Sequence, residues 1–319
     1  MKKKSEILPN NICFITHQLE HLHNVSVSIS FKAGSLYESK YNNGISHLVE
    51  HLFFRQLSDL SQESLYFNMQ KIGGEITGKT YCDYVTFSIN VIPQYLYDAL
   101  DIMLKFFDDF EWSNSIILKE KEVVLRQIEN KAYSYNQWID SIYFDNTKYT
   151  LPIMGTKKTV KSLTAFEINS WKKEYFSPTN SCVTITGNFS NEFYDFLKQK
   201  LSIINNFGKK QDPIIEIAPN FTKRNSDNYL TVINADSKLS EVVVLFDIKN
   251  SFDYESVKLI TSILSDGCGS KLSMIMREKY QLTDDIFTQL TSYCGFHRYS
   301  ISYTVKNKNI FNSIDILFK

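Results

Sequence analysis

Residues 44–54 read GISHLVEHLFF, and this stretch places two histidines one helical turn apart with a glutamate between them. An α-helix advances about 100° per residue, so His47, Glu50 and His51 lie within one arc of roughly 100°. The opposite arc carries the apolar residues Ile45, Leu48, Val49 and Leu52. The stretch therefore predicts a helix with one face for packing and one face for chemistry.

Zinc chemistry uses this pattern directly. Imidazole nitrogen is a common zinc ligand, and in an H-x-x-E-H helix the glutamate is the base that deprotonates the attacking water. His47 and His51 are thus candidate zinc ligands, and Glu50 is a candidate catalytic base. The alternative is an ordinary amphipathic helix with two surface histidines, because the spacing also arises by chance.

The flanks of this helix carry further signals. Residues 31–38 read FKAGSLYE and residues 73–80 read GGEITGKT. Together with the helix they resemble the pitrilysin/insulinase family of H-x-x-E-H (inverzincin) zinc peptidases, which has F-x-A-G-S-x-x-E, N-G-x-x-H-x-x-E-H and G-G-x-x-N-A-x-T in this order. More matching segments follow at 120–127 (EKEVVLRQ), 155–156 (GT), 175–180 (YFSPTN) and 272–282, where Arg277 lies.

The resemblance implies an α+β fold of two repeated domains, each an antiparallel sheet covered by helices, that form one half of a clam-shaped peptidase. Within this family, the chain resembles the half-length members, namely the bacterial subunits that are similar to mitochondrial processing peptidase. We expect an N-terminal domain at 1–204, a linker at 205–227 and a partial C-terminal repeat at 228–319. The second repeat stops within the helix expected at 311–319, so it looks truncated or short.

Hydrophobic patterning supports a repeat independently. An alternating strand at 24–31 leads into the His47 helix, and a Val-rich strand at 241–248 leads into a helix expected at 255–264. The two strand-helix units are offset by roughly two hundred residues, which fits two domains in a chain of 319 residues.

The third metal ligand departs from the family pattern. The family has a carboxylate at the last position of E-R-x-V-V-L-x-E, where this chain has Gln127. An amide oxygen is neutral and a poorer zinc donor than a carboxylate, so zinc would be held weakly or lost. Glu120 lies two turns earlier on the same helix face, about 10 Å away, and cannot take over. By resemblance, Glu120 supports the active site by holding a ligand from behind.

Further departures concern substrate binding. The resemblance assigns Arg277 to the peptide backbone and the developing oxyanion, but the family's tyrosine seven residues later is Asp284 here, and a carboxylate opposes an oxyanion. The family's Asn-Ala is Thr77-Gly78, although pairing of a peptide with this sheet edge needs no particular side chain. His17, His21, His23 and His297 are expected outside the metal site.

Composition sets limits on partners and compartment. The chain has 35 basic and 35 acidic residues, so no strong field favours nucleic acid or an anionic membrane. It lacks an apolar run of signal-peptide or membrane-span length. The five cysteines (Cys13, Cys82, Cys182, Cys268 and Cys294) lack C-x-x-C spacing. Reduced thiols and a cytoplasmic location are therefore expected.

Three functional hypotheses follow from these residues. The first is a zinc-dependent endopeptidase that binds extended peptides by strand addition and uses Glu50 as its base. The second is a catalytically silent paralogue that serves as a peptide-binding or scaffold subunit, as Gln127 and Asp284 suggest. In the third, a partner chain supplies the missing groups. All three imply a homodimer or a heterodimer with a related chain, because one half of a clam cannot enclose a substrate.

Overall fold

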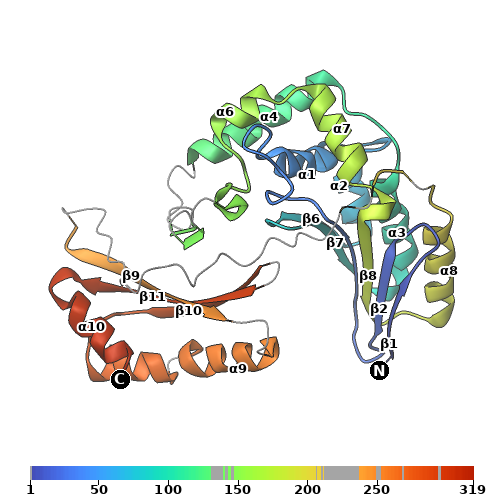
Figure 1. Cartoon of the computed structure of the whole chain (residues 1–319). Helices are drawn as coiled ribbons and strands as arrows, with labels where there is room; N and C mark the ends of the chain where they lie inside the picture. Colours follow the sequence, from blue (N-terminus) through green and yellow to red (C-terminus); the bar gives the residue numbers. More distant parts are fainter. Residues whose placement is uncertain are drawn as a thin grey trace. The chain divides into compact units, whose positions relative to one another are not determined.

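A computed structural model of the chain describes residues 2–130, 139–140, 143–144, 147–205, 207–209, 211, 237–248, 253–267, 269–293 and 296–319. Its contacts divide it into two compact units, Met1–Ile214 and Ile215–Lys319. Each unit combines a sheet with helices (Figure 1). The predicted α+β fold class is thereby confirmed.

Unit 1 is built on a six-stranded sheet with the order β1-β2-β8-β3-β7-β6. The strands are β1 (Lys2–Ile7), β2 (Cys13–Gln18), β3 (Val25–Phe31), β6 (Glu75–Thr80), β7 (Val85–Val91) and β8 (Ser181–Gly187). Strands β3, β7 and β8 alternate buried and half-buried residues along their whole length. This period of two gives the sheet one apolar face for the core and one face rich in Ser and Thr.

Helices cover the apolar face. They are α1 (Ile45–Arg55), α2 (Gln62–Lys71), α3 (Leu96–Leu104), α4 (Asn114–Asn130), α6 (Lys157–Ser162), α7 (Ala165–Tyr175) and α8 (Asn191–Ser202), with a small hairpin β4 (Gln56–Leu57) and β5 (Leu60–Ser61) after α1. Figure 1 shows α3 and α8 alongside the strands and α1, α4, α6 and α7 together at one end. The core between them is aromatic, with Phe31, Phe53 and Phe87 fully buried.

Unit 2 repeats the strand-helix beginning of unit 1 in smaller form. Its three-stranded antiparallel sheet has the order β10-β11-β9. Its elements are β9 (Leu239–Ile248), α9 (Tyr254–Ser265), a π-helical turn (Ser273–Lys279), β10 (Ile286–Tyr293), β11 (Phe296–Lys306) and α10 (Ile310–Leu317). A second, separate core forms around Met276, Tyr303 and Val305.

The strands and helices expected near residues 24–31, 241–248, 255–264 and 311–319 are present, each within a few residues of its expected bounds. One feature of the sheet differs from expectation: β2 and β8 pair in parallel, in a sheet that is otherwise antiparallel. The two strands are separated by more than 160 residues of chain, so no local pattern encodes their direction. Most of the linker expected at 205–227 lies outside the described residues, and its bounds stay a prediction.

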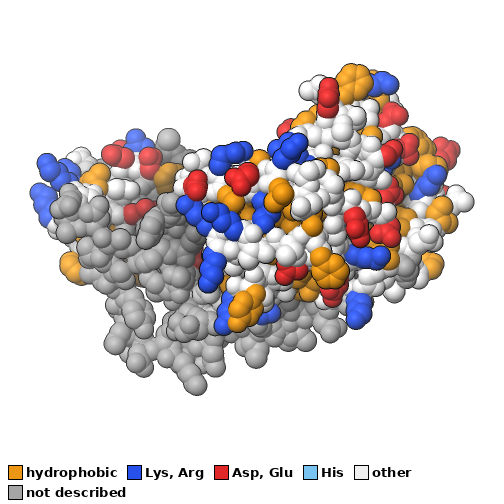
Figure 2. Space-filling view, turned by 90° about the horizontal axis from the view of Figure 1, so that it is seen from above, with side chains coloured by type: hydrophobic (Ala, Val, Ile, Leu, Met, Phe, Trp, Pro, Cys, Tyr) orange, Lys and Arg blue, Asp and Glu red, His pale blue; other side chains and the backbone are white. Residues whose placement is uncertain are grey.

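Charged side chains of both signs lie on the surface of the described residues. Figure 2 shows Lys and Arg side chains interspersed with Asp and Glu on the face in view. Within the described helices, none is both long and apolar enough to cross a bilayer.

Candidate functional site

Helix α1 is held at its N-terminus by a buried acid. Gly44 at the N-cap has no side chain to offer, and Glu38, only 1% exposed, supplies the cap instead. Its Oε2 accepts hydrogen bonds from Gly44 N (2.7 Å) and Asn43 Nδ2 (2.9 Å), and its Oε1 accepts one from Ser46 N (2.9 Å). Burial raises the pKa of Glu38, and these donors oppose the rise. The cap fixes where the helix begins, and so where its polar face points.

Two glycines fix the same end of α1 against a second segment. Gly44 and Gly155 both have positive φ, +93° and +73°. A Cβ on Gly44 would lie 2.6 Å from Met154 O, and a Cβ on Gly155 would lie 2.4 Å from Asn43 O. The two backbones therefore touch, and α6 begins directly after the contact with a Thr156–Thr159 capping box.

Helices α1 and α4 bring the predicted ligands together. His47 Nε2 lies 3.4 Å from Gln127 Oε1, and His51 Nδ1 donates to Glu120 Oε1 at 2.9 Å. The two imidazole rings are 4.6 Å apart between centroids. Residues predicted from two distant segments thus share one site, with His47 paired to the end of α4 and His51 to its middle.

Glu120 is almost fully buried and has two partners. Besides His51 it accepts a hydrogen bond from Arg55 Nε, and Arg55 Nη1 in turn donates to Gln62 Oε1 at 2.7 Å. Burial raises the pKa of Glu120, but the bonds to His51 and Arg55 outweigh burial and the pKa is lowered. An ionised Glu120 fixes the Nδ1–H tautomer of neutral His51 and leaves the Nε2 lone pair for a metal.

Glu50 contacts strand β6 as well as the imidazoles. Its Oε2 accepts a hydrogen bond from Thr80 Oγ1 at 2.7 Å and lies 3.5 Å from His47 Nδ1. Its Oε1 lies so close to Gly78 that a Cβ there would be only 2.7 Å away. Burial raises the pKa of Glu50, but His47 and Thr80 outweigh this and lower it. Glu50 is therefore a carboxylate at neutral pH, as a general base must be.

Two of the three candidate donors are imidazoles, which zinc commonly binds, and the third is a neutral amide, which is a poorer zinc ligand. Ligands about 2.1 Å from a tetrahedral zinc lie roughly 3.4 Å from each other. His47 Nε2 and Gln127 Oε1 have this separation, which is long for a hydrogen bond. Among the described residues no three His, Cys, Asp or Glu side chains group around a possible metal position, and the oxygen that lies next to His47 Nε2 is the neutral amide oxygen of Gln127.

The predicted peptide-binding residues lie in both units. Thr77 and Gly78 are on β6, the outermost strand of the described sheet, where Thr77 is exposed and Gly78 faces α1. Arg277 is in the π-helical turn of unit 2, with its Nε 3.5 Å from Glu278 Oε1. Asp284 is exposed in the bend before β10. Of the remaining histidines, His21 and His23 are exposed and His17 is half-buried in β2.

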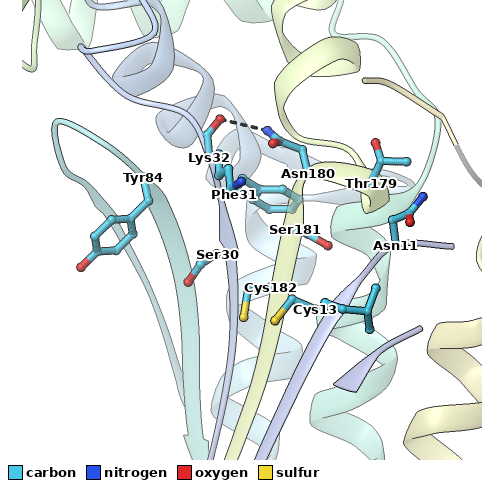
Figure 3. Close-up of a pocket in the computed structure, with 11 residues that line it drawn as sticks. Asn11, Cys13, Ser30, Phe31, Lys32, Tyr84, Thr179, Asn180, Ser181 and Cys182 are labelled. Carbon is cyan, nitrogen blue, oxygen red and sulfur yellow. Dashed lines mark hydrogen bonds between the residues drawn. The ribbon is translucent and has the colours of Figure 1, made fainter. Parts of the chain in front are cut away.

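A separate cavity of about 390 Å³ lies where β2, β3 and β8 meet (Figure 3). Cys13 and Cys182 are register partners on the parallel strands and both line it, with Lys32 and Tyr84 at other points of the wall. Burial raises the pKa of the Cys182 thiol to about 12, and Cys13 adds to the rise. None of the candidate zinc ligands lines this cavity.

Sequence reasoning assigned no role to Glu38, Arg55 or Thr80, although Glu38 and Thr80 lie in the quoted motifs. Each acts through a tertiary contact with α1 or α4. The sequence could have indicated the role of Thr80. Thr80 lies two residues after Gly78 on a strand, so both residues face the same side of the sheet. The roles of Glu38 and Arg55 depend on long-range packing and had no such signal.

Family models match nearly the whole chain in two segments. The model described as "Insulinase (Peptidase family M16)" matches residues 14–157, and the "Peptidase M16 inactive domain" matches residues 162–319. The chain belongs to the M16, or pitrilysin/insulinase, family. The first match contains all the candidate ligands and the base, and the second contains Arg277.

Relatives within the M16 family are distant in sequence. The "uncharacterized zinc protease YmxG" of Bacillus subtilis is 26% identical over 58% of this chain and 46% of that protein. A probable mitochondrial-processing peptidase subunit beta of Arabidopsis thaliana is 21% identical over 79% of this chain and 48% of that protein. The matches thus span about half the length of these relatives. Among solved structures, an M16 inactive domain from Pseudomonas fluorescens has the same fold, with a TM-score of 0.85 at 14% identity over 99% of this chain and 78% of that one.

Proposed function

We propose that this M16 chain is a zinc-dependent endopeptidase, or the peptidase subunit of one, that cleaves extended peptides. One observation carries the proposal: the Glu50 carboxylate accepts a hydrogen bond from Thr80 and lies beside His47, while His51 on the same face of the helix contacts Glu120. A structural helix needs none of these arrangements. An H-x-x-E-H peptidase needs all of them.

The residues of this chain divide the chemical work. His47 and His51 would hold the metal through Nε2, with the Gln127 amide oxygen as a third and weaker donor. When bound, zinc would polarise a water molecule and the scissile carbonyl. Glu50 takes the proton from the attacking water and passes it to the leaving amine. Thr80 keeps the Glu50 carboxylate oriented while the proton moves, and Glu120 keeps His51 in one tautomer.

The substrate would bind along β6. This strand pairs with β7 on one side only in the described sheet, so its outer edge can accept an extended peptide by backbone hydrogen bonding. Gly78 lies on this strand next to Glu50, which would place a peptide bound there close to the base. Arg277, which the family resemblance assigns to the peptide backbone, lies in unit 2, and its role in substrate binding remains a proposal.

A second candidate function is a silent, peptide-binding subunit. Gln127 favours it, because a neutral amide in place of a carboxylate removes one negative charge from the ligand set. In that case β6 would still bind peptide, and a related partner chain would carry out cleavage. The partner hypothesis is common to both functions, and one of the relatives is itself named as a subunit.

The zinc content of protein purified without added metal, together with hydrolysis of a fluorogenic peptide library, tests the proposal. We expect zinc-loaded protein to hydrolyse peptides and Glu50→Gln to lower kcat by about 10³-fold or more, with metal content and melting temperature unchanged. Glu20→Ala, an exposed acid in the same unit, serves as the control. Hydrolysis that persists in Glu50→Gln would show that the activity belongs to another protein, and no hydrolysis in the native chain would favour the silent subunit.

A further inference from the structure

Two carboxylates lie beside the His47–His51 pair, and each is occupied by hydrogen-bond donors. Glu120 is engaged by His51 and Arg55. Glu50 is engaged by Thr80, which sits on strand β6 rather than on the helix that carries the base. Both acids are thereby kept in fixed positions.

The absence of a carboxylate at position 127 makes the position of Glu50 important. Zinc prefers an anionic oxygen to a neutral amide oxygen. A carboxylate that can rotate next to an electron-poor metal site tends to become a ligand, and a ligated carboxylate can no longer accept a proton from water. In a chain with Gln127, a contact that holds the Glu50 carboxylate in place keeps it available as a base.

Strand β6 provides contacts that can hold the Glu50 carboxylate in place. Ile76, Gly78 and Thr80 alternate onto the side that faces α1. Thr80 donates to one carboxylate oxygen, and the missing side chain of Gly78 leaves room for the other. A Cβ at position 78 would lie 2.7 Å from Glu50 Oε1 and 2.6 Å from Phe54 Cε2, so one of these side chains would have to move. The family pattern quoted above has alanine at this position.

We propose that Thr80 and Gly78 form a cradle that holds the Glu50 carboxylate against β6 and keeps it a base instead of a zinc ligand. Thr80 is a positioning residue, because it acts through its hydrogen bond to Glu50. The inference rests on the proposed zinc site. It adds that Glu50 has two possible roles, catalytic base or zinc ligand, and that these roles exclude each other.

The cradle makes an unusual prediction, namely that damaging it tightens metal binding. Thr80→Val keeps the shape of the side chain but removes the donor, and Gly78→Ala fills the space beside Glu50. Both free the carboxylate to ligate zinc. We expect the zinc Kd of each variant to fall by about threefold or more while kcat falls by about tenfold or more. Thr80→Ser keeps the donor and should restore both values.

Competition against a chromogenic zinc chelator measures the Kd, and the peptide library measures kcat. Thr86→Val is the matched control, because Thr86 accepts a hydrogen bond from Ser30 on the half-buried face of β7, away from α1. Thr80→Val made in a Gln127→Glu background should give no further tightening, since a carboxylate ligand is already present there.

Zinc binding that is unchanged or weaker in both Thr80→Val and Gly78→Ala would overturn the cradle. If the native chain binds no measurable zinc, the cradle still requires the two variants to gain binding, and their failure to do so overturns it equally. The two failures can be told apart, because the cradle is judged by the zinc affinity of Thr80→Val and Gly78→Ala, whereas the proposed function fails if Glu50→Gln leaves hydrolysis unchanged.

Discussion

Residue 127 is the position where the candidate metal site departs from the family pattern. Its amide oxygen stands 3.4 Å from His47 Nε2, where the family has a carboxylate. The side chains of Gln and Glu are nearly equal in size, so an exchange alters charge and leaves packing unchanged. The side chains of Gln and Glu differ only in whether an amide nitrogen or a second oxygen is present, so this one atom can change the affinity of the site for zinc.

Gln127→Glu should therefore tighten zinc binding by about tenfold or more, because a negative oxygen replaces a neutral one in the ligand set. The chelator competition used for the cradle measures this at fixed pH. Glu129→Gln is the control on the same helix, since Glu129 is exposed and pairs with Lys157 away from the histidines. Equal affinities for the native chain and Gln127→Glu would refute the assignment of position 127 as a ligand.

Lys172 illustrates how a buried charge makes stability depend on pH. Its Nζ donates to Asp108 O and Phe110 O and lies 3.4 Å from the centre of the Phe110 ring. Burial lowers the pKa of Lys172 from its usual 10.5 to about 8. Between these values the unfolded chain holds a proton that the folded chain has released, so the free energy of unfolding rises with pH.

Urea denaturation of the native chain and Lys172→Met at pH 8 and pH 10 measures this effect. Relative to the variant, the native chain should gain about 2 kcal/mol in free energy of unfolding over this range. Lys119→Met, an exposed lysine on α4, should show no such gain. A native-to-variant difference that stays constant with pH would contradict the lowered pKa.

At the scale of elements, α1 depends on a residue outside itself. Glu38 makes the bonds that an N-cap side chain would normally make, and it lies in the loop that precedes the helix. Glu38→Ala leaves two buried backbone N–H groups without an acceptor and should cost about 2–4 kcal/mol of unfolding free energy.

Glu38→Gln keeps one acceptor oxygen and should cost less than Glu38→Ala. Urea denaturation gives both values, with the exposed Glu20→Ala as the reference. If Glu38→Ala were as stable as this reference, the buried acid would have no role in capping α1.

The elements also show what sequence can and cannot predict. Helix α1 and strands β3 and β9 follow from spacing within ten residues or so, and the structure has them. His47, Glu50 and His51 follow from the same kind of local spacing. Glu120 and Gln127 came only from the family resemblance, because they reach the site through packing of α4 on α1. The parallel β2–β8 pair and the hydrogen bond from Thr80 depend on contacts between distant segments, which no periodicity records.

At the scale of the whole molecule, the two candidate histidine ligands are mostly buried but keep part of their surface exposed. The side chains of His47 and His51 are 14% and 18% exposed, respectively, and the outer edge of β6 is open in the described sheet. Peptide cleavage benefits from a closed, water-poor chamber that fixes the substrate. A second chain that covers this face would provide one.

We therefore expect the chain to form a homodimer or, given Gln127 and Asp284, a heterodimer with a related chain that has the Arg and Tyr pair. Multi-angle light scattering of the protein alone, and co-expressed with related chains from its genome, measures the mass of the assembly. Efficient peptide cleavage by a species that is strictly monomeric during turnover would contradict this expectation.

The contact between Gly44 and Gly155 bears on how this family evolves. Neither glycine can acquire a side chain without pushing two backbones apart, so folding requires glycine at both positions, whatever the protein does. A descendant that had given up catalysis would still carry them, together with Glu38. The presence of Gly44, Gly155 and Glu38 therefore indicates the fold and gives no information about catalytic activity. The positions that bear on activity lie elsewhere, at residues 127 and 284, where this chain departs from the family pattern.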